Sequence, residues 1–188
     1  MKILTVGRER ASEVSDLRVR AYSRGTNLRQ PDYSWALWND SDDAALVMVC
    51  EINGSIVSTM RLQVLADHAQ LADSLSIPKY RSLHPAPFGV LGRGATHQDY
   101  GGQGLSMRLR LALMKRATGA GVRTLVGRLA ATSRRLRFLE DIGYEVSPLP
   151  SPKVPGIPFV IAQLDLDKYG DSAAARIAEA ILRAPSQK

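Results

Sequence analysis

Apolar residues along the chain follow two spacings, one typical of strands and one typical of helices. Short apolar or alternating runs predict strands at about residues 2–7, 44–52, 55–65, 88–96, 123–130, 144–146 and 159–166. Apolar side chains that repeat every three or four residues predict helices at 12–22, 105–117, 133–142 and 171–184. Ser12 is expected to cap the first of these helices, and Asp171 or Ser172 the last.

Two segments lack a clear period. Residues 26–43 are polar and contain both tryptophans, which indicates an ordered loop or a short helix. Residues 66–88 contain Pro78, Pro85 and Pro87 and support at most one short helix. The order of the remaining elements mixes hairpins with crossover helices. We therefore expect an α/β (α+β) fold with a mixed central β-sheet flanked by helices on both faces.

The dipeptide Asn53-Gly54 separates the second and third predicted strands. Asn and Gly tolerate the positive φ angles that a two-residue hairpin turn requires. The sequence therefore predicts a β-hairpin over residues 44–65.

Length and composition set broad limits. The 188 residues suit a single domain, and 45% hydrophobic residues are enough to form a core. No apolar run approaches the roughly 18 residues of a membrane helix, and the N-terminus lacks the features of a secretory signal. We therefore expect a cytoplasmic protein with no membrane span. Cys50, the single cysteine, lies in an apolar run and is expected to be a buried side chain rather than a nucleophile.

A glycine-rich segment precedes the helix predicted at residue 105. From Thr96 to Ser106 it reads Thr-His-Gln-Asp-Tyr-Gly-Gly-Gln-Gly-Leu-Ser. Glycines let backbone N–H groups approach an anion at the positively polarised start of a helix, so a pyrophosphate would fit there. The same glycines are compatible with a simple tight turn, and no Gly-Lys-Ser/Thr of a P-loop follows them.

Residues 99–106, the following helix and Gly119-Ala120-Gly121 resemble the acyl-CoA-binding motif of the GNAT acyltransferase superfamily. The run from Arg137 to Tyr144 is similar to that superfamily's second helix and the strand start after it. The first half of the chain resembles acyl-homoserine-lactone synthases and FeeM-like N-acyl amino acid synthases. The residues that carry this second likeness are Arg18, Tyr22, Trp35, Asp40, Asp43, Asn53-Gly54, Ser58 to Leu62 and Gly92-Arg93. The combined resemblance covers roughly residues 14–146.

The resemblance implies a single-domain GNAT fold. It places an acceptor-side half at about residues 1–88, an acyl-thioester-binding half at about 89–168 and the terminal helix after them. It also implies an acyl-CoA, or an acyl-phosphopantetheine on an acyl carrier protein, as donor, and no metal. The donor-binding residues implied are Gly94, Ala95, Thr96, Gly101, Gly102, Gln103, Gly104, Leu105 and Ser106.

Three positions depart from the family pattern. The family's glutamate, three residues before Arg93, falls on Val90. The tyrosine that many GNAT enzymes use as leaving-group acid falls on Leu139, and the arginine that often opens the glycine motif is Gly101. The candidates for the base are Glu51, His84, His97 and Asp99, and an amine of lowered pKa could also lose its proton through water. We expect Glu51, His97 and Arg93 to be the catalytic residues.

Arginines are the best candidates for binding the acceptor, because a guanidinium can grip a carboxylate with two parallel hydrogen bonds. Arg18, Arg61 and Arg93 could act in this way, together with Trp35. The alternative is that Arg18 and Arg61 form structural pairs with Asp40 or Asp43.

The formal charge of +7 is compatible with nucleic acid, a phosphorylated ligand or an acidic protein as partner. Aromatic residues make up only 6% of the chain, and no zinc motif or helix-turn-helix spacing is present, so we expect no nucleic acid. Within the resemblance, the basic residues after the glycine loop could bind the CoA 3′-phosphate or an acidic acyl carrier protein. They are Arg108, Arg110, Lys115, Arg116, Arg123, Arg128, Arg134, Arg135 and Arg137.

The sequence as a whole favours an N-acyltransferase that moves an acyl group, expected to be fatty, from such a thioester to the amine of an amino-acid-like small molecule. An acetyl-CoA-dependent N-acetyltransferase, a homoserine-lactone synthase that uses S-adenosylmethionine and a catalytically silent acyl-thioester-binding protein are the alternatives. Residue spacing does not define acyl length, donor carrier, acceptor or oligomeric state.

Overall fold

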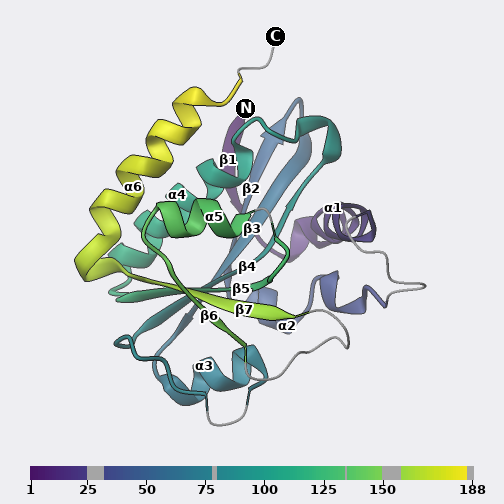
Figure 1. Ribbon diagram of the computed structural model, residues 1–188. Coiled ribbons are helices and arrows are strands. Elements are labelled where there is room, and N and C mark those ends of the chain that lie inside the picture. The colour runs from purple at the N-terminus through teal and green to yellow at the C-terminus, as the bar shows by residue number, and fades with distance from the viewer. Residues whose placement is uncertain (25–31, 78–79, 134, 150–157, 186–188) are drawn as a thin grey trace. The chain divides into compact units, whose positions relative to one another are not determined.

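The computed structural model describes residues 1–24, 32–77, 80–133, 135–149 and 158–185. Seven strands within these residues form one mixed sheet in the order β1-β2-β3-β4-β5-β7-β6 (Figure 1). The strands are β1 (Lys2–Val6), β2 (Leu46–Ile52), β3 (Ser55–Leu65), β4 (Phe88–Thr96), β5 (Thr124–Ala130), β6 (Glu145–Pro148) and β7 (Phe159–Asp165). The helices are α1 (Ala11–Ser23), α2 (Asp40–Asp43), α3 (His68–Leu75), α4 (Leu105–Gly119), α5 (Arg135–Asp141) and α6 (Leu166–Arg183).

The chain divides into two compact units. The first comprises residues 1–63, 92–113 and 178–188, and the second comprises residues 64–91 and 114–177. The expected boundary between the acceptor-side half and the thioester-binding half is at about residue 88. Each of the two units contains residues from both of these halves.

In the first unit, β2 pairs antiparallel with both β1 and β3. Asn53 and Gly54 form the turn between β2 and β3 with φ angles of 51° and 80°, which confirms the predicted hairpin. Helix α1 packs Val14 and Leu17 against one face of the sheet, in a cluster that includes Val49. Cys50, the next residue, points to the opposite face because side chains alternate along a strand, and its thiol contacts the Leu105 carbonyl at the start of α4. Helices thus lie on both faces of this part of the sheet.

In the second unit, β5 runs parallel to β4 and antiparallel to β7, which in turn pairs antiparallel with β6. The parallel pairing places Phe88 opposite Thr124. Phe88 belongs to a buried apolar cluster with Leu71 and Leu75 of α3 and with Val126 and Ile161. The mixed parallel and antiparallel pairing confirms the expected fold class.

Two helix starts differ from the prediction. Ser12 does not cap α1, because the 3₁₀ turn Arg8–Arg10 runs directly into the helix and leaves no separate capping position. The terminal helix begins at Leu166 rather than at residue 171, and the Asp165 carboxylate accepts the Lys168 N–H at 3.1 Å as its cap. Asp165, the last residue of β7, therefore caps α6, and no loop separates the strand from the helix.

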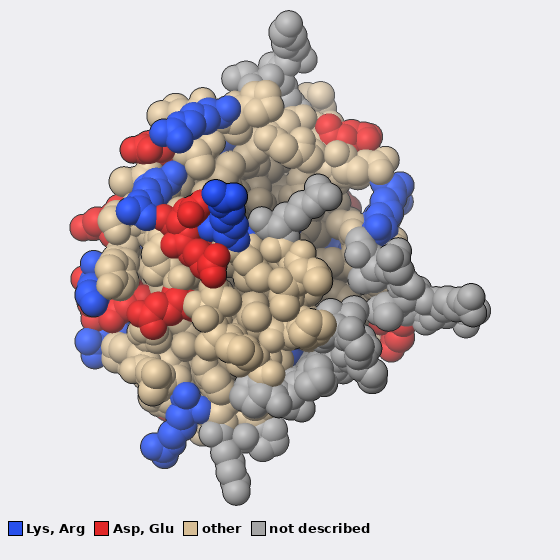
Figure 2. Space-filling view, viewed as in Figure 1, with Lys and Arg blue, Asp and Glu red and all other residues tan. Residues whose placement is uncertain are grey.

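The basic residues between 108 and 137 do not all lie on the surface. Arg128 is half-buried and donates to the Leu75 carbonyl at 3.3 Å, whereas Arg123 forms an ion pair with Asp167. Arg134 lies outside the described residues. On the face drawn in Figure 2, Lys and Arg side chains are interspersed with Asp and Glu. The exposed basic surface is therefore smaller than the sequence predicted.

Candidate functional site

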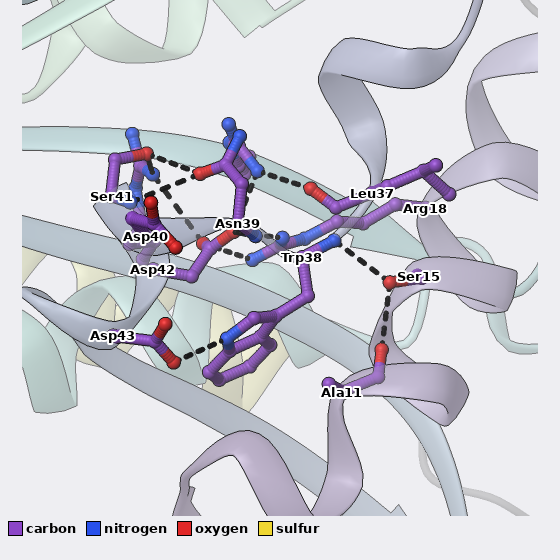
Figure 3. Close-up of polar contacts among 12 residues, drawn as sticks. Ala11, Ser15, Arg18, Leu37, Trp38, Asn39, Asp40, Ser41, Asp42 and Asp43 are labelled. Carbon is purple, nitrogen blue, oxygen red and sulfur yellow. Dashed lines mark hydrogen bonds and ion pairs between the residues drawn. The ribbon is translucent and has the colours of Figure 1, made fainter.

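Three arginines converge on a single carboxylate in the first unit. Asp42 accepts two hydrogen bonds from Arg18 of α1 (Figure 3). It also accepts hydrogen bonds from Arg61 of β3 and Arg93 of β4. Arg18 and Asp42 are both fully buried, and the side chains of Arg61 and Arg93 are 11% and 14% exposed. We call these four residues the arginine cluster.

Local structure aims Asp42 inward. Asn39 begins α2 with a capping box, in which its side chain accepts the Ser41 N–H and its own N–H donates to Asp42. The preceding residue, Trp38, donates its N–H to Ser15 of α1 at 2.8 Å. Asp42 is therefore held by backbone as well as by guanidinium groups, whereas the neighbouring Asp43 pairs with the exposed Arg8.

The Arg18 guanidinium pairs with the Asp42 carboxylate through both of its terminal nitrogens. Its two terminal nitrogens donate to the two carboxylate oxygens at 3.0 and 3.1 Å, in the bidentate geometry that suits Arg and carboxylate. The side chain is fully buried, so a ligand could not reach it without opening the pair. Arg18 and Arg61 thus pair with Asp42 rather than with the expected Asp40 or Asp43.

Arg93 occupies an unusual backbone position. Its φ is +51°, in the left-handed region that residues other than glycine seldom adopt, although Gly92 and Gly94 flank it. The guanidinium donates to Asp42 at 2.6 Å and to the Leu37 carbonyl at 2.8 Å. β4 therefore brings Arg93 into the arginine cluster at the point where its regular strand geometry is interrupted.

The arginine cluster has an excess of positive charge. Three guanidiniums face one carboxylate, which leaves two positive charges without a partner in the cluster. Burial lowers the pKa of Arg93 to about 10 and also lowers the pKa of Arg61, and Arg61 lowers the pKa of Arg93 further. Among the described residues, buried Nε atoms of Arg18 and Arg61 have no hydrogen-bond partner. An anionic ligand group would offset this imbalance.

An aromatic pair lies beside the arginine cluster. The rings of Tyr22 and Trp35 are 4.8 Å apart and tilted by 38°. The Tyr22 hydroxyl donates to the Gly94 carbonyl of β4 at 3.3 Å. Trp35 is 51% exposed. All four residues that the sequence predicts to bind the acceptor, Arg18, Arg61, Arg93 and Trp35, lie in the same unit as Gly94.

The glycine loop has the backbone shape that an anion cradle needs. Gly102 and Gly104 have φ angles of +78° and +73°, and α4 begins at the next residue, Leu105. The first N–H groups of a helix lack partners within the helix, so they are free to bind a phosphate. A side chain at Gly102 would meet no atom within 4 Å, so that side of the loop is open.

A hollow of about 260 Å³ adjoins this loop in the first unit. The Gln103 side-chain oxygen is buried without a partner among the described residues. The residues that line the hollow include Gln103, Leu105, Arg108, Ile181 and Ala184.

The base candidates from the sequence have other contacts. Glu51 forms an ion pair with Arg10 at 2.6 Å. His97 accepts the Asp99 N–H on Nδ1 at 3.4 Å. His84 lies 3.3 Å from Glu145, in the second unit. The structure therefore does not single out any of these residues as the base.

The two positions where the family pattern predicts acid–base groups are buried and apolar. Val90 belongs to the buried cluster around Phe88, and Leu139 is 1% exposed. Among the described residues, no group of three His, Cys, Asp or Glu side chains could hold a metal ion. No helix in the described part of the chain is long and apolar enough to cross a membrane.

Comparison with known proteins defines the fold. No protein-family model matches the chain, and no curated protein sequence matches it either. Solved structures do match. The ribosomal-protein-S18-alanine N-acetyltransferase from Escherichia coli aligns over 87% of this chain and 92% of its own, with a TM-score of 0.62 and 18% identity. An N-acetyltransferase from Staphylococcus aureus Mu50 aligns over 88% and 98%, with a TM-score of 0.61 and 16% identity.

A CoA-dependent acyl-homoserine lactone synthase, BjaI, solved with SAM and isopentyl-CoA, aligns over 96% of this chain and 98% of its own. Its TM-score is 0.60 at 17% identity. The chain therefore has the GNAT-like fold, as its motifs predicted. Both branches suggested by the sequence, N-acetyltransferases and acyl-homoserine lactone synthases, occur among its structural neighbours.

Sequence reasoning missed Asp42, the centre of the arginine cluster. Asp40, Asp42 and Asp43 lie within one turn of α2, and their spacing alone does not indicate which of them points inward. The available signal was Asn39, whose capping box places the residue three positions later at the inner side of the first turn.

Proposed function

We propose that the protein is an N-acyltransferase that moves a fatty acyl group from an acyl-CoA or acyl carrier protein thioester to the amine of an amino-acid-like acceptor. The observation that carries this proposal is the charge of the arginine cluster. Two guanidiniums, those of Arg61 and Arg93, are partly exposed and share a single carboxylate with buried Arg18. An acceptor carboxylate that binds there brings the charge of the cluster closer to neutrality.

The donor end of the reaction is assigned to β4 and the glycine loop. Backbone N–H groups of Gly94 to Thr96 would hold the thioester carbonyl, and those of Gly102 to Ser106 would hold the phosphates. Arg93 precedes Gly94 directly in the sequence, so the acceptor carboxylate and the thioester would bind at neighbouring residues of one strand. Proximity of amine and carbonyl then supplies much of the rate acceleration.

Basic residues on the helix after the loop support a phosphate-bearing donor. Lys115 and Arg116 are exposed on α4, and Arg108 lines the hollow beside the loop. Such residues would attract the phosphates of CoA or an acidic acyl carrier protein. The proposed partners are thus a small amine acceptor and a phosphopantetheine-bearing donor.

A catalytically silent acyl-thioester-binding protein is the second candidate. It is favoured by Val90 and Leu139, two buried apolar residues at the positions where the family pattern predicts a base and an acid. Such a protein would bind the donor through the glycine loop without releasing thiol.

The test is release of free thiol from acetyl and long-chain acyl donors, carried by CoA or by acyl carrier protein, with a pool of amino acids. Matched amines without the carboxylate serve as the acceptor control. We expect turnover with amino acids and long-chain donors. Binding of the donor without thiol release from any pair would support the silent protein, and turnover restricted to acetyl-CoA would support an acetyltransferase.

The acceptor site is tested by the double variant Arg61→Gln/Arg93→Gln. We expect the acceptor KM to rise at least about tenfold, because each lost hydrogen bond to a charged group weakens binding by roughly 1.5–3 kcal/mol. Arg123→Gln is the matched control, since Arg123 forms an exposed pair with Asp167. An unchanged acceptor KM in the double variant would contradict the assignment.

A further inference from the structure

Arg61 and Arg93 are the two arginines of the cluster that a ligand can reach, because both side chains are partly exposed. Within the described part of the chain, each of them makes all of its hydrogen bonds through one terminal nitrogen, Nη1. Arg61 donates to the Ser41 hydroxyl at 2.7 Å and to Asp42 at 3.4 Å. Arg93 donates to Asp42 and to the Leu37 carbonyl. The second terminal nitrogen of each guanidinium therefore remains a donor for a ligand.

These two guanidinium groups lie near one another. Arg61 and Arg93 donate to different oxygens of the same Asp42 carboxylate, Oδ1 and Oδ2. Arg18, by contrast, uses both of its terminal nitrogens on Asp42 and is fully buried. One small molecule with two anionic groups can therefore reach Arg61 and Arg93 at once, whereas Arg18 is closed to it.

The charge of the cluster calls for two anionic groups rather than one. Arg93 still carries its charge near neutral pH, because burial lowers its pKa only to about 10. The other carboxylates of α2, those of Asp40 and Asp43, pair with the exposed Arg8, where solvent and salt screen them. A ligand with a single carboxylate leaves one of the two excess positive charges uncompensated. A ligand with two carboxylates brings the cluster to neutrality.

We propose that the acceptor is a dicarboxylic amino acid of the aspartate or glutamate class, an inference that rests on the proposed function. Arg93 binds the α-carboxylate, because Arg93 directly precedes Gly94 on the strand assigned to the thioester and the amine is one carbon away from that carboxylate. Arg61 binds the side-chain carboxylate. A guanidinium rewards a carboxylate more than the neutral amide of the same shape, so Arg61 is the residue that determines acceptor specificity.

The first test needs neither turnover nor a variant. Isothermal titration calorimetry near neutral pH measures the Kd of the wild type for glutamate and glutamine, and for aspartate and asparagine. The two members of each pair have nearly the same shape and differ by one negative charge. We expect the acid to bind at least about tenfold more tightly than its amide in one or both pairs, the usual weight of a hydrogen bond between charged groups. Equal Kd values within both pairs, or no binding by any of the four, would overturn the proposal.

The second test assigns the preference to Arg61. In Arg61→Gln the acid and its amide should bind equally well, whereas Arg61→Lys, which keeps the charge, should keep part of the preference. In Arg93→Gln all four amino acids should bind more weakly, because the α-carboxylate that they share loses its partner. Arg176→Gln is the control for net charge and should bind as the wild type does, since Arg176 is an exposed residue of α6 in the second unit. A preference for the acid that survives Arg61→Gln would overturn the role of Arg61.

The two proposals fail in different ways. A wild type that acylates glutamine and asparagine as readily as glutamate and aspartate contradicts the dicarboxylic acceptor and leaves the acyltransferase in place. A wild type that binds the acids more tightly than their amides, but releases no thiol with any donor, contradicts the proposed function and leaves the specificity of the arginine cluster in place.

Discussion

The Arg18 guanidinium and the Asp42 carboxylate form an ion pair in which neither side chain is exposed, with two hydrogen bonds of 3.0 and 3.1 Å. Because neither group can be rehydrated in place, each depends on the other. Arg61 and Arg93 add two more donors to the same carboxylate. Asp42 therefore has both a structural and a site-forming role.

Replacement of Asp42 should destabilise the protein strongly. Asp42→Asn leaves three guanidiniums without a carboxylate, and breaking a buried pair costs about 3–5 kcal/mol in the free energy of unfolding. Urea unfolding followed by circular dichroism measures the change. Asp167→Asn is the control, because Asp167 and Arg123 form an exposed pair that contributes little. Equal stability of the two variants would contradict the role given to Asp42.

Carboxylate ligands should stabilise the folded protein. They offset the excess charge of the arginine cluster, and a ligand at 100 times its Kd adds about 2.7 kcal/mol to the free energy of unfolding. Thermal unfolding with an amino acid, an N-acyl amino acid and a matched amine without a carboxylate measures this effect. The amine should give no shift, and Arg61→Gln/Arg93→Gln should respond to none of the three. A shift that persists in this variant would place carboxylate binding elsewhere.

Cys50 should react slowly with thiol reagents in the folded protein. Burial raises the pKa of its thiol from 9.0 to about 11, so near pH 8 the thiolate is about a hundredfold scarcer than in the unfolded chain. The folded state keeps this proton between about pH 9 and pH 11, whereas the unfolded state releases it. The contribution of Cys50 to stability is therefore present below pH 9 and is lost as pH rises through that window.

The reaction of Cys50 with an aromatic disulfide reagent, with and without urea, measures this accessibility. A folded protein that reacts as fast as the unfolded one would show that the thiol is not shielded.

The two left-handed glycines of the loop should respond differently to alanine. Gly102→Ala meets open space, so its cost is limited to the roughly 1–2 kcal/mol of a left-handed residue with a Cβ. Gly104→Ala adds a contact of 3.2 Å with the Ala184 Cβ of the segment after α6. It should therefore destabilise the protein more than Gly102→Ala does.

A double-mutant cycle separates the two costs at Gly104. Ala184→Gly in the Gly104→Ala background should recover the steric part of the loss and leave the backbone part. If the double variant were as unstable as the sum of the single variants, the contact with Ala184 would have no energetic weight.

Elements with local signals were predicted correctly from the sequence. The Asn53-Gly54 turn and the strand at residues 88–96 match the structure, because turn chemistry and apolar alternation are short-range properties. The GNAT-like fold was predicted from the glycine loop and the downstream Gly143-Tyr144 pair, two short motifs that stand in the expected order and at a suitable separation.

Features that depend on distant partners were not predicted. The positive φ of Arg93 has no sequence signal, since either flanking glycine could adopt it at lower cost. The Arg93 side chain donates hydrogen bonds to Asp42 and to the Leu37 carbonyl, and both of these residues lie more than 50 positions earlier in the chain. The early start of α6 was missed because Asp165 both ends a strand and caps a helix. Pairings of this kind are determined by tertiary packing.

The position of the aromatic residues gives the protein a built-in optical probe. Both tryptophans of the chain lie beside the arginine cluster, where Trp35 stacks on Tyr22 and the Arg18 guanidinium lies 6.0 Å from the Trp38 ring centre. Trp38 also donates its indole N–H to Asp43 at 2.7 Å. All tryptophan fluorescence of the unmodified protein therefore originates at this one place. A ligand that binds there should change the emission directly, so its binding can be followed without an attached dye.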